Sequence, residues 1–374
     1  MNGAVRRRAA PFLMALDAGA KPAHLRAFTP LGASQKDQGM SLVVPAEWAP
    51  HRAMWLGFPS HADLWEDDLA QAQEEVAALA RALAGPGGER VRLLTGSSQG
   101  EADARRLLGD AAGVEITPGA FGDIWLRDTG PIFAKTETGA LQAQGFRFNG
   151  WGGKYLLPHD DEVADQIARA AATRLVTNGF VLEGGALDHD GFGTVLTTGQ
   201  CLLNPNRNPG WTAQTAEESL AEALGAKALL WLGEGLRNDH TDGHVDNLAR
   251  FVAPGVVVCP VAFGRGDPNG GAYDDAARRL AGFTDARGEK LKVMRIPSPG
   301  WVEDEDGGYV PASHMNFVIA NQAVIVPVYE DKASPLALEG FKTLFPDRKV
   351  IGLPSKAILT GGGSFHCITQ QEPA

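Results

Sequence analysis

The sequence has few cysteines, no long apolar run and no excess of basic residues. Only Cys201, Cys259 and Cys367 occur among 374 residues, too few and too widely spaced for a disulfide framework, so we expect a chain of the reducing cytoplasm. No apolar run reaches the roughly 20 residues that a membrane-spanning helix needs, which argues against a membrane protein. Lys and Arg number 34 against 45 Asp and Glu, a formal net charge of −11. This balance argues against nucleic acid as a partner and favours a cationic ligand.

Apolar residues and glycine are plentiful. Hydrophobic residues make up 44% of the chain and charged residues 21%, which is typical of a globular protein. The 46 glycines and 23 prolines predict many tight turns. Residues 1–39 differ, because Arg6-Arg7-Arg8 precede a short apolar stretch that Pro11 interrupts, which makes a poor secretory signal. We expect 1–39 to be a poorly ordered extension and 40–374 to be a single catalytic domain.

A strand–strand–helix–strand pattern recurs about every 50 to 70 residues. Its paired strands are predicted at 131–135 and 141–148, 186–189 and 194–198, 245–252 and 256–261, and 315–320 and 323–327. The helices that follow are predicted near 161–172, 215–224, 273–280 and 335–344, and the return strands near 175 and at 227–231, 292–296 and 349–353. In the second unit, Thr215 and Glu218 predict a capping box and Gly225 a helix end. A fifth unit opens at Phe365 and would be completed by the strand at 53–58.

Repeated units of this length bury one another's faces in radial arrays. We therefore predict an α/β fold, a five-bladed pseudo-symmetric α/β propeller of strand-strand-helix-strand units, closed by joining the two chain ends. An ordinary mixed α/β sheet is the alternative.

Each predicted unit enters its first strand through a polar cluster. In a ring of similar units these entry points meet at one end of the axis. The side chains expected to converge there are Asp128, Glu183, His244, Asp246 and Cys367. His244 and Asp246 stand two apart, so on a strand both would face the same side. His366 would face away from Cys367 on a strand and is therefore a poor candidate for the base.

This set of side chains suits chemistry on a planar cation. Two carboxylates can clamp a guanidinium group, a cysteine can attack its central carbon, and a histidine can give a proton to the leaving amine and later activate water. Glu183 could fix the orientation and charge of the histidine. The glycines from Gly361 to Gly363 let the backbone approach a ligand closely, which makes Gly362 and Gly363 candidates for substrate binding.

Each feature also has a simpler explanation. Cys367 could be a buried packing residue, Asp128 could belong to a surface ion pair, and Glu183 could serve a turn. The cluster 239–246 could bind a metal ion and serve a metal-dependent amidohydrolase. Against that reading, the chain has neither a second histidine pair nor an H-E-x-x-H helix.

From Pro45 to its end the chain resembles the agmatine deiminase family, within the guanidine-modifying superfamily that also includes bacterial peptidylarginine deiminases. The segments that support the resemblance are 47–51, 125–131, 148–153, 182–185, 241–247 and 361–371. The resemblance implies a five-bladed α/β propeller with no metal or organic cofactor. It also implies that Cys367 is the nucleophile, His244 the general acid and base, and Glu183 a support for the histidine and the substrate. Asp128 and Asp246 would hold the guanidinium group.

The hypothesis from the sequence is hydrolysis of agmatine to N-carbamoylputrescine and ammonia through a covalent thiouronium on Cys367. Trp125 would lie near the alkyl stem of this small cationic guanidine substrate. Trp151-Gly152-Gly153 continues directly into Lys154-Tyr155, whereas many agmatine deiminases continue through an Asp-Gly-Leu-Tyr-type loop. This departure concerns recognition of the substrate tail. A deiminase of peptidyl or free arginine and a non-catalytic polyamine-binding module are alternatives, and homo-oligomerisation is left open.

Overall fold

The computed structural model describes residues 42–304 and 307–374. The predicted extension at 1–39 lies outside these residues. Of the helices in the described part of the chain, none combines the length and the apolar character needed to cross a membrane.

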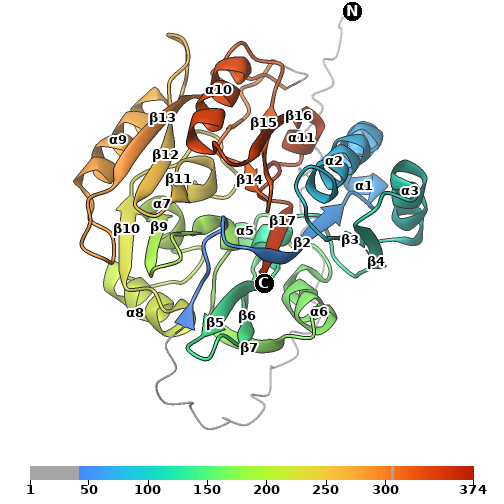
Figure 1. Cartoon of the computed structure of the whole chain (residues 1–374), viewed down its shortest axis with the longest axis horizontal. Helices are drawn as coiled ribbons and strands as arrows, with labels where there is room; N and C mark the ends of the chain where they lie inside the picture. Colours follow the sequence, from blue (N-terminus) through green and yellow to red (C-terminus); the bar gives the residue numbers. More distant parts are fainter. Residues whose placement is uncertain (1–41, 305–306) are drawn as a thin grey trace, which may run out of the picture.

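The described residues form five separate sheets arranged around the middle of the molecule (Figure 1). In hydrogen-bonded order, the first sheet consists of β1 (Leu42–Val43), β5 (Ile132–Thr136), β6 (Leu141–Arg147) and β7 (Arg174–Val181). The second consists of β10 (Ala228–Leu232), β9 (Thr194–Thr198) and β8 (Asp188–His189), and the third of β11 (Arg250–Ala253), β12 (Val256–Val261) and β13 (Lys292–Pro297). The fourth consists of β14 (Val318–Ile319), β15 (Ala323–Val328) and β16 (Lys349–Pro354), and the fifth of β17 (Thr369–Pro373), β2 (His51–Phe58), β3 (Val91–Thr95) and β4 (Val114–Pro118).

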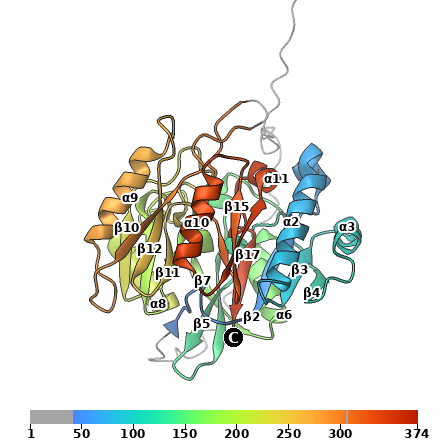
Figure 2. The ribbon, with the colours of Figure 1, turned by 45° about the horizontal axis from the view of Figure 1, so that its top comes forward.

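The longer helices lie on the outer rim of this arrangement, with the strands inside (Figures 1 and 2). They are α2 (Leu69–Ala84), α3 (Ser98–Leu108), α6 (Val163–Ala170), α8 (Ala213–Leu224), α9 (Gly270–Gly282) and α10 (Ser334–Leu344). The short helices are α1 (Ala62–Trp65), α4 (Leu126–Thr129), α5 (Gly150–Gly153), α7 (Gly199–Leu202) and α11 (Lys356–Thr360). The 3-10 turns are η1 (Glu66–Asp68), η2 (Asp160–Glu162), η3 (Gly184–Ala186) and η4 (Val245–Asn247).

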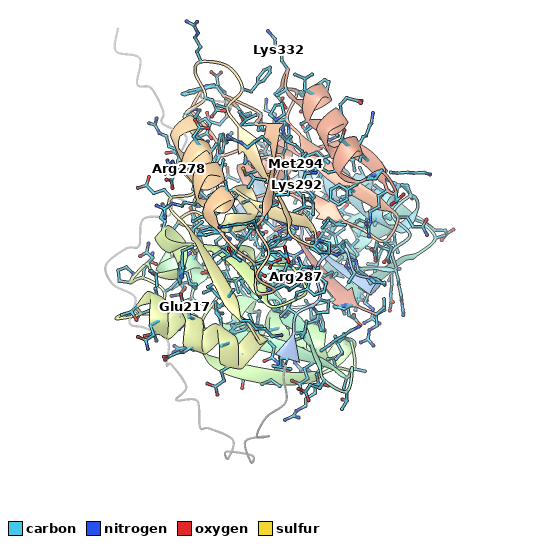
Figure 3. The ribbon with its side chains drawn as sticks, turned by 60° about the vertical axis from the view of Figure 1, so that its left-hand side comes forward. Glu217, Arg278, Arg287, Lys292, Met294 and Lys332 are labelled. Atoms are coloured by element: carbon cyan, nitrogen blue, oxygen red, sulfur yellow. The ribbon has the colours of Figure 1, made fainter. Side chains whose placement is uncertain are left out.

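The outer helices are amphipathic. In α2 the residues Ala72, Val76, Leu79 and Leu83 recur at helical spacing and are all buried. On the exposed faces of their helices, Glu217 of α8 and Arg278 of α9 point outward into solvent (Figure 3). Burial of one face therefore holds each helix against its sheet.

The sheets share one pattern of connection. In each sheet an antiparallel pair is followed by a strand that runs parallel to the second member of the pair: β5–β6–β7, β8–β9–β10, β11–β12–β13, β14–β15–β16 and β17–β2–β3. A parallel neighbour requires a crossover connection, which the outer helices provide. The predicted mixed α/β class is confirmed.

The last sheet joins the two ends of the described chain. Strand β17 pairs antiparallel with β2, and Thr369 lies opposite Leu56. The turn before β17, which carries Cys367, is therefore anchored by a strand from near the start of the described chain. Figure 2 shows β17 beside β2.

Three predicted strands are shorter than expected. The segment 186–189 begins at the end of the turn η3, and β8 contains only Asp188–His189. The segment 245–252 begins as the turn η4, and β11 starts only at Arg250, while the segment 315–320 contains strand only at Val318–Ile319. Buried polar side chains explain the last two differences. Asn316 donates from its side-chain amide to Asn247 Oδ1 at 2.9 Å, and Ser313 donates to the Asn247 carbonyl at 2.7 Å. These bonds between neighbouring turns replace strand pairing.

The predicted capping box of α8 is wrong. The helix begins at Ala213, and its N-cap is Thr212, whose hydroxyl accepts a hydrogen bond from the Thr215 amide at 3.2 Å. Thr215 is thus the third helical residue and not the cap. The predicted end is right, because Gly225 adopts the left-handed conformation that closes a helix.

Candidate active site

Five side chains predicted to converge come from turns at the starts of four units. Asp128 belongs to α4, Glu183 precedes η3, His244 precedes η4, Asp246 lies within η4, and Cys367 lies in the turn before β17. All five are at least 95% buried. The structure brings them together, as their mutual distances show.

His244 lies between two carboxylates. Its Nδ1 is 3.7 Å from Asp128 Oδ2, and its Nε2 is 3.7 Å from Glu183 Oε2. Neither ring nitrogen has a hydrogen-bond partner among the described residues. Burial lowers the pKa of His244, but Asp128, Cys201 and Glu183 outweigh it and raise the pKa well above its usual range. The ring is therefore held as an imidazolium that can donate a proton.

Gly185 sets the separation of these groups. A Cβ atom on this residue would lie 2.6 Å from His244 Nδ1, 2.8 Å from Asp128 Oδ1 and 3.0 Å from Asp246 Oδ2. Its amide donates to Asp128 Oδ1 at 2.9 Å. Only glycine therefore lets the imidazole and both aspartates face one another. The sequence showed a Glu-Gly-Gly turn but gave no sign that its last glycine lies at the centre.

Asp128 and Asp246 differ in their hydrogen bonds and in the direction in which their pKa is shifted. Asp128 Oδ2 accepts a hydrogen bond from Trp151 Nε1 at 2.8 Å. Burial raises the pKa of Asp128. The negative charges of Asp246 and Glu183 raise it further, and together these effects outweigh His244, which lowers it. Burial also acts on Asp246, but its hydrogen bond with His366 and the nearby positive charges lower its pKa. Asp246 Oδ1 is buried and has no partner among the described residues.

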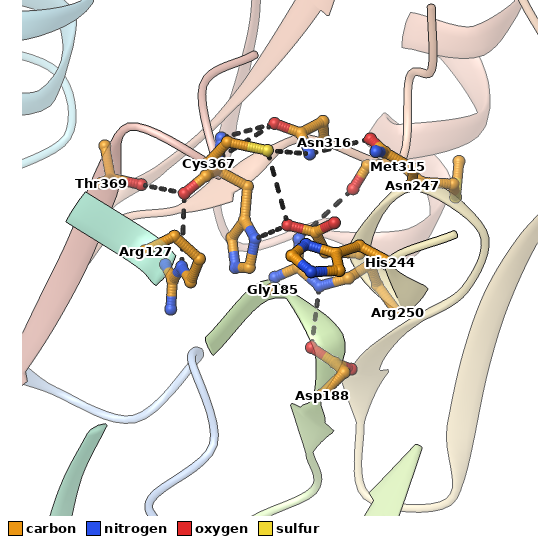
Figure 4. Close-up of polar contacts among 12 residues, drawn as sticks. Arg127, Gly185, Asp188, His244, Asn247, Arg250, Met315, Asn316, Cys367 and Thr369 are labelled. Atoms are coloured by element: carbon orange, nitrogen blue, oxygen red, sulfur yellow. Dashed lines mark hydrogen bonds and ion pairs between the residues drawn. The ribbon is translucent and has the colours of Figure 1, made fainter. Parts of the chain in front are cut away.

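Cys367 lies close to Asp246 in a turn held by Asn316 (Figure 4). Its Sγ is 3.7 Å from Asp246 Oδ2 and 3.1 Å from Asn316 Nδ2, while Asn316 Oδ1 accepts from the amides of His366 and Cys367 at 2.9 and 3.2 Å. Burial and the charges of Asp246 and Asp128 raise the pKa of the Cys367 thiol well above its usual range. The free enzyme thus holds a protonated thiol.

The reasoning from strand geometry was wrong at two points. His244 and Asp246 lie at a 3-10 turn, so the turn and not a shared strand face brings them together. Residues 365–368 also form a turn, so His366 does not face away from Cys367. His366 Nδ1 and Cys367 Sγ both approach Asp246 Oδ2, at 2.8 and 3.7 Å. His366 is nonetheless engaged by Asp246 and Glu47, the latter at 3.1 Å.

Glu183 is supported by residues that sequence reasoning missed. Arg207 donates from Nε to Glu183 Oε1 at 2.8 Å, and Cys201 Sγ lies 4.0 Å from Glu183 Oε2. Burial raises the pKa of Glu183, but His244 and Arg207 lower it further than burial raises it. Arg207 lies in an irregular loop without periodicity, so no sequence pattern pointed to it.

The possible metal ligands differ from those predicted. Within the described residues, Glu183, Cys201 and His244 place ligand atoms within 4.8 Å of one another. In the predicted cluster 239–246, Asp239 accepts from Thr241 at 2.9 Å, and Asp242 accepts from Lys154 at 2.6 Å. Those two carboxylates therefore hold the loop by hydrogen bonds.

A cavity leads to the thiol. It is lined by Trp125, Asp128, Trp151, Tyr155, Leu157, His240, Thr241, Gly361, Gly362 and Cys367. A second cavity is lined by Glu47, Arg127 and His366 but by neither Cys367 nor Asp128. The first cavity is thus the candidate substrate pocket.

The glycine loop shapes this pocket beside Trp125. A Cβ atom on Gly363 would lie 2.7 Å from the Trp125 ring and 3.0 Å from Cys367 Sγ. Gly362 lines the pocket and has a φ of 108°, which favours glycine. The Trp125 ring stacks on Trp65, with centroids 6.3 Å apart. A flat apolar wall therefore stands next to the thiol.

Known proteins share both the sequence and the architecture. Agmatine deiminase of Stutzerimonas stutzeri is 39% identical over 354 residues, which cover 88% of this chain and 95% of that protein. The solved structure of the Enterococcus faecalis agmatine deiminase superposes with a TM-score of 0.83 at 35% identity, over 89% of this chain and 96% of that one. A C. jejuni agmatine deiminase variant with substrate bound gives a TM-score of 0.82 at 27% identity, over 90% and 98%.

The match to a family extends over almost the whole described chain. Residues 43–373 fit the Porphyromonas-type peptidyl-arginine deiminase family. With these matches and the buried cysteine, histidine and carboxylates in place, the chain belongs to the Porphyromonas-type peptidyl-arginine deiminase family.

Proposed function

We propose that this protein is an agmatine deiminase, which hydrolyses agmatine to N-carbamoylputrescine and ammonia. Relatives that bear this name match about nine-tenths of the chain in sequence and in structure. The observation that carries the proposal is the meeting of Cys367, His244, Asp128 and Asp246 around Gly185 at the end of one pocket.

The guanidinium group would bind between Asp128 and Asp246. Asp246 Oδ1 is a buried acceptor without a partner among the described residues, and a guanidinium N–H can satisfy it. Two buried carboxylates so close together repel each other, and a planar cation between them relieves that repulsion. A neutral urea product gives no such relief, so the site favours release of the product.

Substrate binding would also activate the nucleophile. The charges of Asp246 and Asp128 hold the pKa of Cys367 high, and a bound guanidinium offsets both charges. The thiol then gives its proton to solvent, and the thiolate attacks the guanidinium carbon, forming a C–S bond while the C=N π electrons move onto nitrogen. His244 gives a proton to one amino group, the C–N bond breaks, and ammonia leaves behind a thiouronium on Cys367.

The second half of the reaction would use the same histidine in reverse. His244 has given up its proton and can accept one from a water molecule that attacks the thiouronium carbon. The C–S bond breaks, the new hydroxyl group on the carbon gives its proton to the departing thiolate, and the carbon leaves as a ureido group with the thiol of Cys367 restored. Glu183 stabilises the imidazolium form of His244 in both steps.

The pocket wall would hold the rest of the substrate. Trp125 lies beside the thiol and offers a flat apolar surface to the alkyl stem. Further out, Tyr155 Oη lies 3.1 Å from His240 Nδ1, and Lys154 binds Asp242 and the His240 carbonyl. Lys154 and Tyr155 stand at the point in the sequence where many agmatine deiminases continue through an Asp-Gly-Leu-Tyr-type loop.

We also propose that the five sheets are the blades of a five-bladed α/β propeller and that residues 40–374 form one catalytic domain. The recurring strand order and the pairing of β17 with β2 support this reading. Cysteines free of disulfides support an enzyme of the cytoplasm, where agmatine deimination feeds polyamine synthesis.

A substrate panel tests the function. Release of ammonia would be measured from agmatine, free arginine and an arginine-containing peptide, with the Cys367→Ala variant as the control. We expect the highest kcat/KM with agmatine and none above background for the variant. Preference for the peptide or for arginine would instead assign the alternative deiminase activity.

A further inference from the structure

Asp246, His366 and Glu47 form a buried chain of polar contacts, called the relay below. His366 Nδ1 contacts Asp246 Oδ2 at 2.8 Å, and its Nε2 contacts Glu47 Oε2 at 3.1 Å. All three side chains are at least 94% buried. Glu47 comes from the segment before β2 and His366 from the turn before β17, so the relay spans two parts of the chain that are far apart in sequence.

The far end of the relay is fixed by Arg250. This fully buried arginine donates to Asp188 Oδ1 at 2.8 Å and to the Met315 carbonyl (Figure 4). It also pairs with Glu47 Oε2 and donates to the Phe317 carbonyl. Glu47 Oε1 accepts from the Ile319 amide at 2.7 Å. Glu47 is thus held by a buried arginine and a backbone amide as well as by His366.

Each ring nitrogen of His366 faces a carboxylate oxygen, and an imidazolium has an N–H for each of them. Burial raises the pKa of Glu47, but Arg250 and His366 lower it well below its usual range, and the pKa of Asp246 is lowered too. Both carboxylates are therefore acceptors for ring N–H groups of His366.

We propose that His366 and Glu47 are positioning residues for the guanidinium site: they hold Asp246 by its Oδ2 so that Oδ1 is left to accept from the guanidinium group. The observation behind this is the contrast within one carboxylate. Oδ2 has a short contact with His366, whereas Oδ1 is buried without a partner among the described residues. The inference rests on the proposed function, because it assigns the guanidinium group to Oδ1.

The His366 imidazolium would have a second effect. It places a positive charge beside the carboxylate of Asp246, whose Oδ2 is 3.7 Å from Cys367 Sγ. Without that charge, Asp246 would act on the thiol with its full negative charge and the thiolate would be harder to form. Loss of His366 should therefore weaken guanidinium binding and slow the attack as well.

The test measures binding separately from chemistry. Calorimetry would give the Kd of agmatine for Cys367→Ala, which cannot turn over, and for the same variant carrying His366→Phe, which fills the imidazole volume without a donor. Loss of a charged hydrogen bond predicts binding weaker by roughly 10-fold to 100-fold. His366→Asn, which keeps a donor near Nδ1, should recover part of the affinity, and Glu47→Gln should lose less than His366→Phe.

His51→Phe is the matched control. His51 is a buried histidine that contacts Glu89 at 3.0 Å, like His366 with Glu47, but it does not touch the site. Its replacement should leave the Kd of agmatine unchanged. Unchanged affinity in His366→Phe, or equal loss in His51→Phe, would overturn the inference, and thermal unfolding of each variant would identify a loss that is due to misfolding. If His366→Phe misfolds, the Kd values of agmatine for His366→Asn and Glu47→Gln are compared instead.

The same experiment separates this inference from the proposed function. If Cys367→Ala binds free arginine but not agmatine, the proposed substrate is wrong, and the His366 comparison is then read with arginine, which has the same guanidinium group. If it binds neither, both the function and the inference fail.

Discussion

At the scale of single residues, the site depends on the smallest side chain in it. Gly185 lets His244 Nδ1, Asp128 Oδ1 and Asp246 Oδ2 surround one point, and no other residue fits there. The reactive side chains themselves could be predicted from the sequence, because cysteine, histidine and carboxylates are the residue types that this chemistry needs. Gly185, Asn316 and Arg207 could not be identified in this way, because the role of each is set only by its neighbours in space.

Gly185→Ala should abolish most activity without unfolding the protein. The added methyl group would push His244 and the two aspartates apart, and a misplacement of about 1 Å can cost roughly 100-fold in rate. Steady-state kinetics with agmatine measure this loss. Gly179→Ala is the matched control, since its Cβ would meet nothing within 4 Å. Near-normal kcat/KM in Gly185→Ala would contradict the geometry.

The raised pKa of Cys367 predicts the pH dependence of its alkylation. A thiol whose pKa lies above its usual range is protonated at neutral pH, so alkylation by neutral iodoacetamide should be slow at pH 7. The rate should rise about tenfold per pH unit as long as the pH stays below that pKa. Mass spectrometry of the peptide carrying Cys367 follows the reaction.

A positive charge on the reagent should change this behaviour. Chloroacetamidine carries an amidinium group that offsets Asp128 and Asp246, so it should react faster at pH 7 than neutral chloroacetamide. Equal rates for the two reagents would show that these carboxylates do not control the thiol.

At the scale of elements, periodicity identified the helices and most strands of the recurring pattern, and it failed where buried polar side chains decide the backbone. The helix α10 and the strand β2 match their predictions because apolar spacing alone fixes them. The segments around Asp246, Asn316 and Cys367 were expected to be strands and are turns. Hydrogen bonds between units hold those turns, and one segment's sequence cannot show a partner from another unit.

The N-cap of α8 gives a test at this scale. Because Thr212 and not Thr215 caps the helix, Thr212→Ala should lower the free energy of unfolding by about 1 kcal/mol. Thr215→Ala, in the first turn, should cost less. Urea unfolding of the two variants compares them, and a larger loss for Thr215→Ala would restore the capping box predicted from the sequence.

At the scale of the whole molecule, the active site is completed by the joining of the chain ends. Arg127 lies next to Asp128 and ties the first unit to the last strand: its guanidinium donates to the His366 carbonyl and to the side chains of Gln370 and Gln371. Its own amide donates to the Cys367 carbonyl at 3.0 Å. The position of the turn that carries Cys367 therefore depends on these hydrogen bonds of Arg127. The sequence indicated that the ends meet, but it did not indicate which residue fastens them.

Arg127→Met should reduce both stability and activity. Loss of its buried hydrogen bonds should cost at least about 2 kcal/mol in the free energy of unfolding, and kcat/KM should fall about tenfold or more as the Cys367 turn loosens. Arg348→Met is the matched control, because Arg348 also donates to distant carbonyls, those of Trp48 and Ala320, but touches no site residue. It should lower stability and leave kcat unchanged. Equal kinetic losses would show that closure at Arg127 has no special role.

The covalent step is tested most directly by trapping the enzyme during turnover. The protein would be mixed with agmatine, quenched in acid and digested, and the peptide carrying Cys367 weighed by mass spectrometry. We predict an adduct with the mass of agmatine less one ammonia on Cys367, absent from Cys367→Ala, which should release no ammonia. Ammonia release at an undiminished rate by Cys367→Ala, or an adduct on another residue, would contradict the account.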